Sequence, residues 1–237
     1  SNLNVDLIDR INPFGGAYSI LSKTMTEESL RQLHSIISSK KLSMNLEEAR
    51  DLTKRAIENT AYRFDILKLK SNLKTENAEN LSFQSETFDA VYSWGVLHHS
   101  PDTNRCFKEV HRVLKPGGFA KIMIYHKHSP VGWMLWLKYG FLKGKPFRKL
   151  SDIYSMHLES PGTKAYTLSE AKDLLSDFSN FDMKIQLSFA DLLEGNVGAR
   201  HKSLLLSIGK IVYPRFLIKL IARFIPIGLF ILITAQK

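Results

Sequence analysis

The sequence predicts an α/β protein built on a doubly wound, mainly parallel β-sheet. Three successive features indicate this fold. Phe88–Ser93 is a short, mostly apolar run rich in β-formers, typical of a strand covered on both faces. Next comes a helical pattern, with Phe107, Val110 and Leu114 at intervals of three and four residues, and then a second apolar run, Phe119–Tyr125. Strand, crossover helix and strand form a right-handed unit that binds ligands beyond the carboxyl ends of its strands.

The helix between these strands has clear end signals. Pro101 and Asp102 are expected to begin it, with Asp102 capping the free amide groups of the first turn. The Lys-Pro-Gly-Gly sequence at 115–118 is expected to end it, because proline blocks continuation and glycine adopts conformations that other residues resist. Within the helix, Glu109 and Arg112 are predicted to be a surface ion pair worth a few tenths of a kcal/mol.

Weaker patterns precede this unit. We expect short strands at Val5–Ile8 and Leu73–Thr75, a turn at Asn12–Gly16, and amphipathic helices at Ser19–Ile37, broken near its start, and Leu46–Ile57. The first 45 residues are the least regular part of the chain.

The C-terminal half continues the α/β pattern. Thr167–Phe178 is predicted to be a helix, opened by Thr167 and Glu170 as a reciprocal cap. Met183–Phe189 and Gly228–Ala235 are predicted to be the last two strands. His126–Lys164 is an aromatic and basic insertion without a clean period. We therefore expect one domain over residues 1–237, with a divergent N-terminal region and this insertion.

Composition limits the compartment and the partners. The single cysteine, Cys106, excludes an intramolecular disulfide, and the N-terminus does not resemble a secretion signal, so the expected location is the cytoplasm. The net charge of +10 favours anionic partners. Two stretches combine basic residues with large apolar ones and lack acids, at 127–149 and 210–223. This combination favours a membrane surface or an apolar acidic ligand over nucleic acid, unless the lysine stems simply cover core helices.

One family resemblance accounts for the most regular part of the chain. Residues 77–83 read NAENLSF, residues 87–102 read TFDAVYSWGVLHHSPD, and residues 109–118 read EVHRVLKPGG. These runs resemble the second half of the cofactor-binding core in class I S-adenosylmethionine-dependent methyltransferases. The resemblance covers about residues 46–126 and implies a Rossmann-like fold with an antiparallel C-terminal hairpin. It also implies S-adenosylmethionine as the cofactor.

The resemblance assigns roles to individual residues. Asn77 and Ala78 fall where the family's loop after strand three contacts the adenine, and Ser93, Trp94 and Gly95 fall beside the donor's methionine part. The other interpretations are a plain polar loop for the first pair and a core position for Trp94. Either His98 or His99 is a candidate to orient the acceptor or take its proton, or else it fixes the loop by hydrogen bonding. No metal site is expected, because His126 and His128 lack a cysteine or acid at ligand spacing.

The sequence departs from the family at the glycine-rich first loop, for which Asp9 to Gly16 is a poor match. Three explanations stay open: a divergent cofactor site, lost activity, or a replaced N-terminal segment. We expect methyl transfer to a small-molecule or lipid-like acceptor, with Trp133 and Trp136 in an acceptor lid formed by the insertion. The alternative is a catalytically inactive binding module that associates with a membrane surface or a partner protein. A nucleic-acid substrate would rest on net charge alone.

Overall fold

A computed structural model of the chain describes residues 4–9, 19–22, 57–58, 60–62, 64–65, 70–159, 161–194 and 213–237. The chain groups into two compact units, each of which is described by itself. The first unit comprises residues 1–122, 174–182 and 233–237, and the second comprises residues 123–173 and 183–232.

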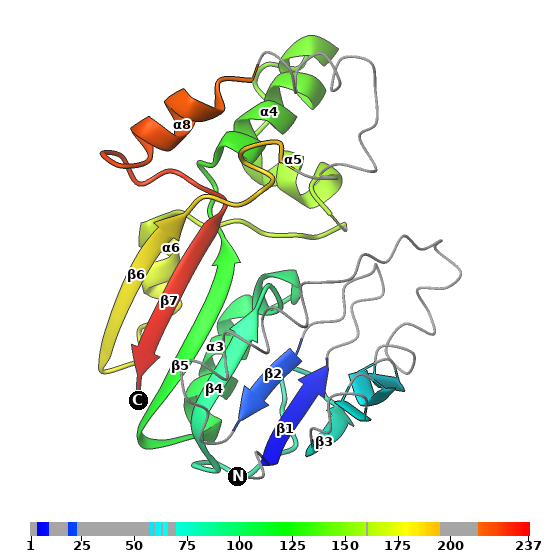
Figure 1. Cartoon of the computed structure of the whole chain (residues 1–237), viewed down its shortest axis with the longest axis vertical. Coiled ribbons are helices and arrows are strands. Elements are labelled where there is room, and N and C mark those ends of the chain that lie inside the picture. Colours follow the sequence, from blue (N-terminus) through cyan, green and yellow to red (C-terminus); the bar gives the residue numbers. More distant parts are fainter. Residues whose placement is uncertain are drawn as a thin grey trace. The chain divides into compact units, whose positions relative to one another are not determined.

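The described residues form a seven-stranded sheet (Figure 1). Its strands lie in the order β3 (Lys70–Thr75), β1 (Asn4–Asp9), β2 (Ser19–Ser22), β4 (Phe88–Trp94), β5 (Leu114–Tyr125), β7 (Phe230–Gln236) and β6 (Asn180–Gln186). β1 runs parallel to β3, whereas β2 runs antiparallel to both β1 and β4. The arrows of β4 and β5 point the same way in Figure 1, and that of β7 points the opposite way. The sheet is therefore mainly parallel with two reversed strands, as predicted for the fold class.

The C-terminal strands form the antiparallel arrangement that the sequence predicts. Ser179 N donates to Gln236 O at 3.0 Å, which pairs the start of β6 with the end of β7. On the other side of β7, Lys237 N donates to Gly118 O at 2.9 Å and His126 N donates to Leu229 O at 2.7 Å. Early residues of β5 thus face late residues of β7, and late ones face early ones, so β7 is antiparallel to both neighbours.

Seven helical segments with assigned bounds lie in the described part of the chain. They are the 3₁₀ turns η2 (Leu97–His99) and η3 (Phe141–Lys143) and the helices α3 (Thr103–Val113), α4 (Pro130–Tyr139), α5 (Leu150–His157), α6 (Leu168–Asp173) and α8 (Arg215–Ile221). The predicted caps are confirmed. The Asp102 side chain accepts from Arg105 N at 3.0 Å, while Thr167 and Glu170 exchange reciprocal bonds of 2.7 and 3.2 Å.

Several boundaries differ from the prediction. The helix predicted at 167–178 is shorter, since α6 ends at Asp173, and the strand predicted at 183–189 is β6 at Asn180–Gln186. The helix expected from Ser19 is wrong at its start, because Ser19–Ser22 is strand β2. Two apolar residues between serines fit the spacing of a helix and of a strand, and pairing with β1 and β4 makes this segment a strand. β5 begins at Leu114 rather than Phe119, because Gly117 N donates to Lys237 O at 3.2 Å and extends the ladder. The predicted turn at 12–16 and the helices over residues 23–37 and 46–56 lie outside the described residues.

Each unit has its own apolar core. In the first unit, α3 buries Phe107 and Val110 completely, beside Leu97 of η2. In the second unit, Ile153 and Tyr154 of α5 and Ile231 of β7 are buried completely. Full burial of such side chains contributes about 1.5–3 kcal/mol each. α3 contacts η2, which carries the two candidate histidines.

Candidate functional site

Strands β3 and β4 end at the same edge of the sheet. In register, Ser93 of β4 pairs with Ile20 of β2, Ile20 with Ile8 of β1, and Ile8 with Lys74 of β3. Ser93 and Lys74 therefore lie at the same position in the strand register, and the chain leaves both strands at one edge of the sheet. With two strands between them, at about 4.8 Å per step, they are roughly 14 Å apart. Parallel strands present their ligand-binding loops at this kind of edge.

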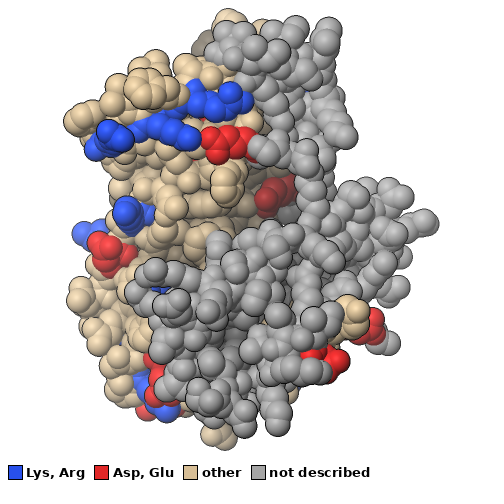
Figure 2. All heavy atoms as spheres, in the orientation of Figure 1, with Lys and Arg blue, Asp and Glu red and all other residues tan. Residues whose placement is uncertain are grey.

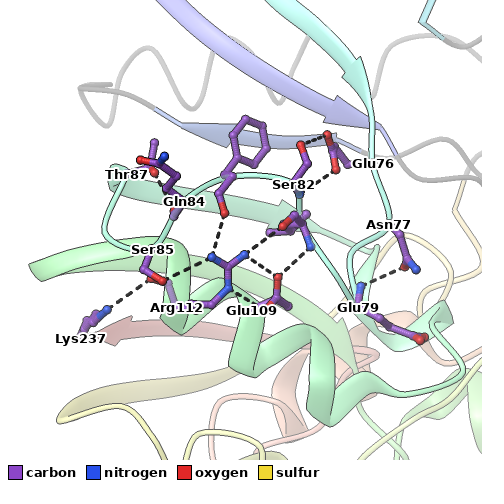
Figure 3. A network of polar contacts seen from close by, with 12 residues as sticks. Glu76, Asn77, Glu79, Ser82, Gln84, Ser85, Thr87, Glu109, Arg112 and Lys237 are labelled. Carbon is purple, nitrogen blue, oxygen red and sulfur yellow. Dashed lines mark hydrogen bonds and ion pairs between the residues drawn. The ribbon is translucent and has the colours of Figure 1, made fainter.

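The loop after β3 turns sharply at the predicted adenine-contact residues. Asn77 Oδ1 accepts from Glu79 N at 3.0 Å, and Asn80 N donates to Asn77 O at 2.9 Å, so Asn77 closes a tight turn with its own side chain (Figure 3). Asn77 is exposed, while Ala78 is buried. Glu76, at the start of the loop, is also buried and accepts from both Ser82 N at 3.0 Å and Ser82 Oγ at 2.5 Å.

Glu79 joins this loop to the segment that follows β4. Its Oε1 accepts from Ser100 Oγ and, at 3.0 Å, from Asp102 N. Ser100 is completely buried and directly follows η2. Glu79 thus brings the loop carrying Asn77 into contact with the segment carrying the two histidines. Sequence reasoning missed this residue, although it is a conspicuous acid within the NAENLSF run.

The predicted residues after β4 fall into two groups. Ser93 is completely buried, and its Oγ makes no hydrogen bond within the described part of the chain. Trp94 is half-buried and stacks on Tyr92 with 6.2 Å between ring centroids. Gly95 is buried with φ of +73°, a left-handed conformation that favours glycine. His98 and His99 follow on η2, with ring centroids 4.3 Å apart; His98 is completely buried and His99 is half-buried.

An ion pair on α3 holds the middle of the β3 loop (Figure 3). Arg112 Nη1 donates to Phe83 O at 2.8 Å and Nη2 donates to Leu81 O at 3.0 Å. Glu109 Oε2 accepts from Leu81 N at 2.7 Å and contacts Arg112 at 2.8 Å. We call Glu109 and Arg112 the α3 clamp. The predicted ion pair exists, but its description as a surface pair is wrong, because the Glu109 side chain is only 14% exposed. The spacing of residues along a helix does not reveal what covers that face of it.

The clamp is also electrostatically matched. The hydrogen bond from Arg112 holds the pKa of Glu109 below its usual value, and the same bond raises the pKa of Arg112. Burial acts to raise the pKa of Glu76, but bonds from Lys74 and Ser82 outweigh it, so that pKa is also lowered. Both carboxyls stay ionised well below neutral pH.

These shifts predict acid lability. The pKa values of Glu76, Glu109 and Glu170 are lowered from 4.5, so their contribution to stability is present above pH 4.5 and is lost as the pH falls below it. Burial lowers the pKa values of His111 and His126 from 6.5, so the unfolded chain takes up their protons first and stability begins to fall near pH 6.5.

The measurement is urea unfolding at pH 7, 6, 5 and 4. The free energy of unfolding is expected to fall throughout, and a Glu109→Gln variant is expected to show a shallower fall between pH 5 and 4, because one lowered carboxyl is gone. Buried Asp191 acts in the opposite direction, since its pKa is raised. A rise in stability from pH 7 to pH 5 would contradict the prediction.

The insertion and the histidines after β5 belong to the second unit. His126 is buried, with Nδ1 3.1 Å from Gly228 O, and burial lowers its pKa. Trp136 Nε1 donates to Arg148 O at 3.1 Å, whereas Trp133 is 48% exposed. The described residues contain no group of three side chains suited to holding a metal ion. The acceptor lid stays a prediction.

Comparison with known proteins finds a family match for one segment of the chain. The model of the methyltransferase domain matches residues 42–122, which include β3, the loop after it, β4, the α3 clamp and most of β5. Residues 42–122 thus match the methyltransferase domain family. The resemblance seen in the sequence is thereby confirmed for this segment.

Parts of the chain are also similar to curated proteins. Phosphoethanolamine N-methyltransferase 2 of Caenorhabditis elegans is 27% identical over 124 residues, covering 52% of this chain and 22% of that protein. Demethylmenaquinone methyltransferase of Bacillus cereus (strain B4264) is 37% identical over 94 residues, covering 37% of this chain and 39% of that protein. The chain thus spans less than half the length of either relative.

Solved structures resemble the chain more distantly. A SAM-dependent methyltransferase of Thermotoga maritima, described as a possible histamine N-methyltransferase, is 18% identical, with a TM-score of 0.43 over 70% of this chain and 63% of that one. The likeness to methyltransferases therefore depends on the sequence match over residues 42–122.

Proposed function

We propose that the chain binds S-adenosylmethionine at the edge where β3 and β4 end and transfers its methyl group to a small-molecule or lipid-like acceptor. The observation that supports this most directly is the pair of hydrogen bonds that Glu79 accepts from Ser100 and Asp102, which joins the loop carrying Asn77 and Ala78 to the segment after β4. Both segments lie within the matched methyltransferase region.

The residues at this edge suit the cofactor. The side-chain amide of Asn77 is exposed and suited to the exocyclic amine of adenine, and Ala78 leaves room beside it. Gly95 permits close approach of a ligand to the backbone, and the buried Ser93 hydroxyl is available to the donor's amino acid part. Bound there, the cofactor would supply the electrophilic methyl group, so the chain's own task is to position two reactants and exclude water.

A proton must leave the acceptor when its nucleophile gains the methyl group. Of the two candidate histidines we favour His99, because it retains exposed surface whereas His98 has none. A histidine takes up a proton near neutral pH, which suits this task. The names of the relatives suggest acceptors to try first, phosphoethanolamine and a demethylated quinone.

Calorimetric titration of the purified chain with S-adenosylmethionine tests the proposal. We expect a dissociation constant below about 100 μM, equivalent to roughly −5.5 kcal/mol. A Gly95→Val variant is expected to abolish the heat, because valine resists the left-handed backbone and fills the space for the ligand. Gln84→Ala, an exposed change in the loop after β3, should bind as the wild type does. No detectable heat with the wild type would instead favour the binding module.

A further inference from the structure

α8 presents an unusually apolar face to solvent. Three large apolar residues of α8 and two just after it are exposed, with Phe216 and Phe224 each 81% exposed; the set is Phe216, Leu217, Leu220, Phe224 and Ile225. On a helix of 3.6 residues per turn, positions 216, 217, 220 and 224 cover an arc of about 100°. The inward face of the helix is formed by half-buried residues such as Ile218 and Ile221. The helix is thus apolar on both sides.

Basic side chains border this apolar arc. Lys219 and Arg223, both exposed, follow one another along one edge of it, and residues 213–225 contain no acid. Figure 2 shows Lys and Arg side chains gathered among uncharged ones over α8. The nearby acid Glu194 pairs with Lys219 at 3.0 Å. The edge keeps a net positive charge.

The partner must therefore accept a broad apolar face and a positive border together. A membrane interface does both, since apolar side chains enter the boundary between headgroups and acyl chains while Lys and Arg contact anionic headgroups. None of the described helices is both long and apolar enough to cross a bilayer. A helix that lies in the membrane plane needs no such length.

The second unit repeats this chemistry elsewhere. Around α4 and η3 it exposes Trp133, Leu137, Phe141, Leu142 and Phe147. The same stretch carries the basic residues Lys138, Lys143, Lys145, Arg148 and Lys149. Two segments of one compact unit thus share the composition of an interfacial surface.

We propose that α8 docks the second unit on an anionic phospholipid bilayer, with Phe216 and Phe224 entering the interface and Arg223 contacting the headgroups. This inference does not depend on methyl transfer. It would nevertheless give the chain direct access to a lipid-like acceptor.

Co-sedimentation of the full 237-residue chain with vesicles tests the docking. One set of vesicles is phosphatidylcholine, and the other contains about 30% phosphatidylserine to supply the anionic surface. We expect the wild-type chain to bind the second set. The double variant Phe216→Ser with Phe224→Ser should bind it at least about tenfold more weakly, because two large apolar groups no longer enter the interface. Arg223→Glu should weaken binding at least about fivefold.

Matched changes control for exposure and charge. Phe189→Ser replaces a phenylalanine that is 75% exposed in the same unit but lies outside α8, and Lys108→Glu reverses an exposed charge on α3. Both should bind vesicles as the wild type does. All variants should keep the wild-type circular dichroism and S-adenosylmethionine affinity, so a failed docking test leaves the proposed function intact.

Four results would overturn the proposal. The first is that the wild-type chain does not bind anionic vesicles, and the second is that it binds neutral vesicles equally well. The third is that the control variants lose as much binding as the α8 variants. The fourth is that the chain binds no vesicles but self-associates, and that the Phe216 and Phe224 changes abolish this self-association. The last result would identify a second copy of the chain as the occupant of this face.

Discussion

Arg112→Ala is expected to lower the free energy of unfolding by about 2–4 kcal/mol and to weaken S-adenosylmethionine binding by about tenfold. The guanidinium makes two hydrogen bonds to carbonyls of the β3 loop and pairs with Glu109. Alanine removes all three and leaves a largely buried carboxylate without its partner. The loop then has to be ordered by the ligand, which reduces affinity.

Two further variants separate the effect of geometry from that of charge. Arg112→Lys keeps the charge but cannot reach both carbonyls and the carboxylate as a planar fork does, so an intermediate loss is expected. Lys108→Ala removes an exposed basic residue of the same helix and should change stability by less than about 0.5 kcal/mol. Urea unfolding and calorimetric titration on each variant provide the two readouts. Wild-type values for Arg112→Ala would show that the clamp does not hold the loop.

The central unit of the fold was predictable because its signals are local. The β-rich run of β4, the spacing on α3 and the caps at Asp102 and Thr167 each depend on neighbours within a few residues. The elements that were not predicted depend on pairing between distant parts of the chain. Strand β2 exists because it pairs on both sides, and the extension of β5 depends on Lys237 at the far end of the chain. Neither partner is visible in a local pattern.

The same distinction applies to the candidate site. Asn77, Ala78, Ser93, Trp94 and Gly95 were found through a family resemblance, and the strand register places their two segments at one sheet edge. What connects the segments was not found. The hydrogen bond from Ser100 to Glu79 spans 21 positions, and those from Arg112 to the loop span 29 and 31. Acids and arginines at such separations look like ordinary surface residues in a sequence.

A buried carboxylate stabilises the second unit in a comparable way. Asp191 is completely buried, and its Oδ2 accepts from Ser188 N, Ser188 Oγ and Leu229 N at 2.8–2.9 Å. Its Oδ1 accepts from Val131 N of α4 at 3.2 Å. Burial raises the pKa of Asp191, although these hydrogen bonds act to lower it. One side chain therefore satisfies backbone donors from three separate segments of the unit.

Asp191→Ala is expected to lower the free energy of unfolding by about 3–5 kcal/mol, because three buried backbone amides lose their acceptor at once. Asp191→Asn keeps the shape but places an NH₂ group against a donor on one side, so a smaller loss of about 2 kcal/mol is expected. Asp173→Ala, an exposed aspartate of the same unit, serves as the control and should stay within about 0.5 kcal/mol of the wild type.

Urea unfolding followed by circular dichroism measures all three Asp191 and Asp173 variants. If Asp191→Ala were as stable as the wild type, water or a shifted backbone would have to satisfy the Ser188, Leu229 and Val131 amides. The carboxylate would then not hold α4 and the start of β7 together. If Asp191→Asn were instead more stable than the wild type, the cost of burying the charge would exceed what its four hydrogen bonds contribute.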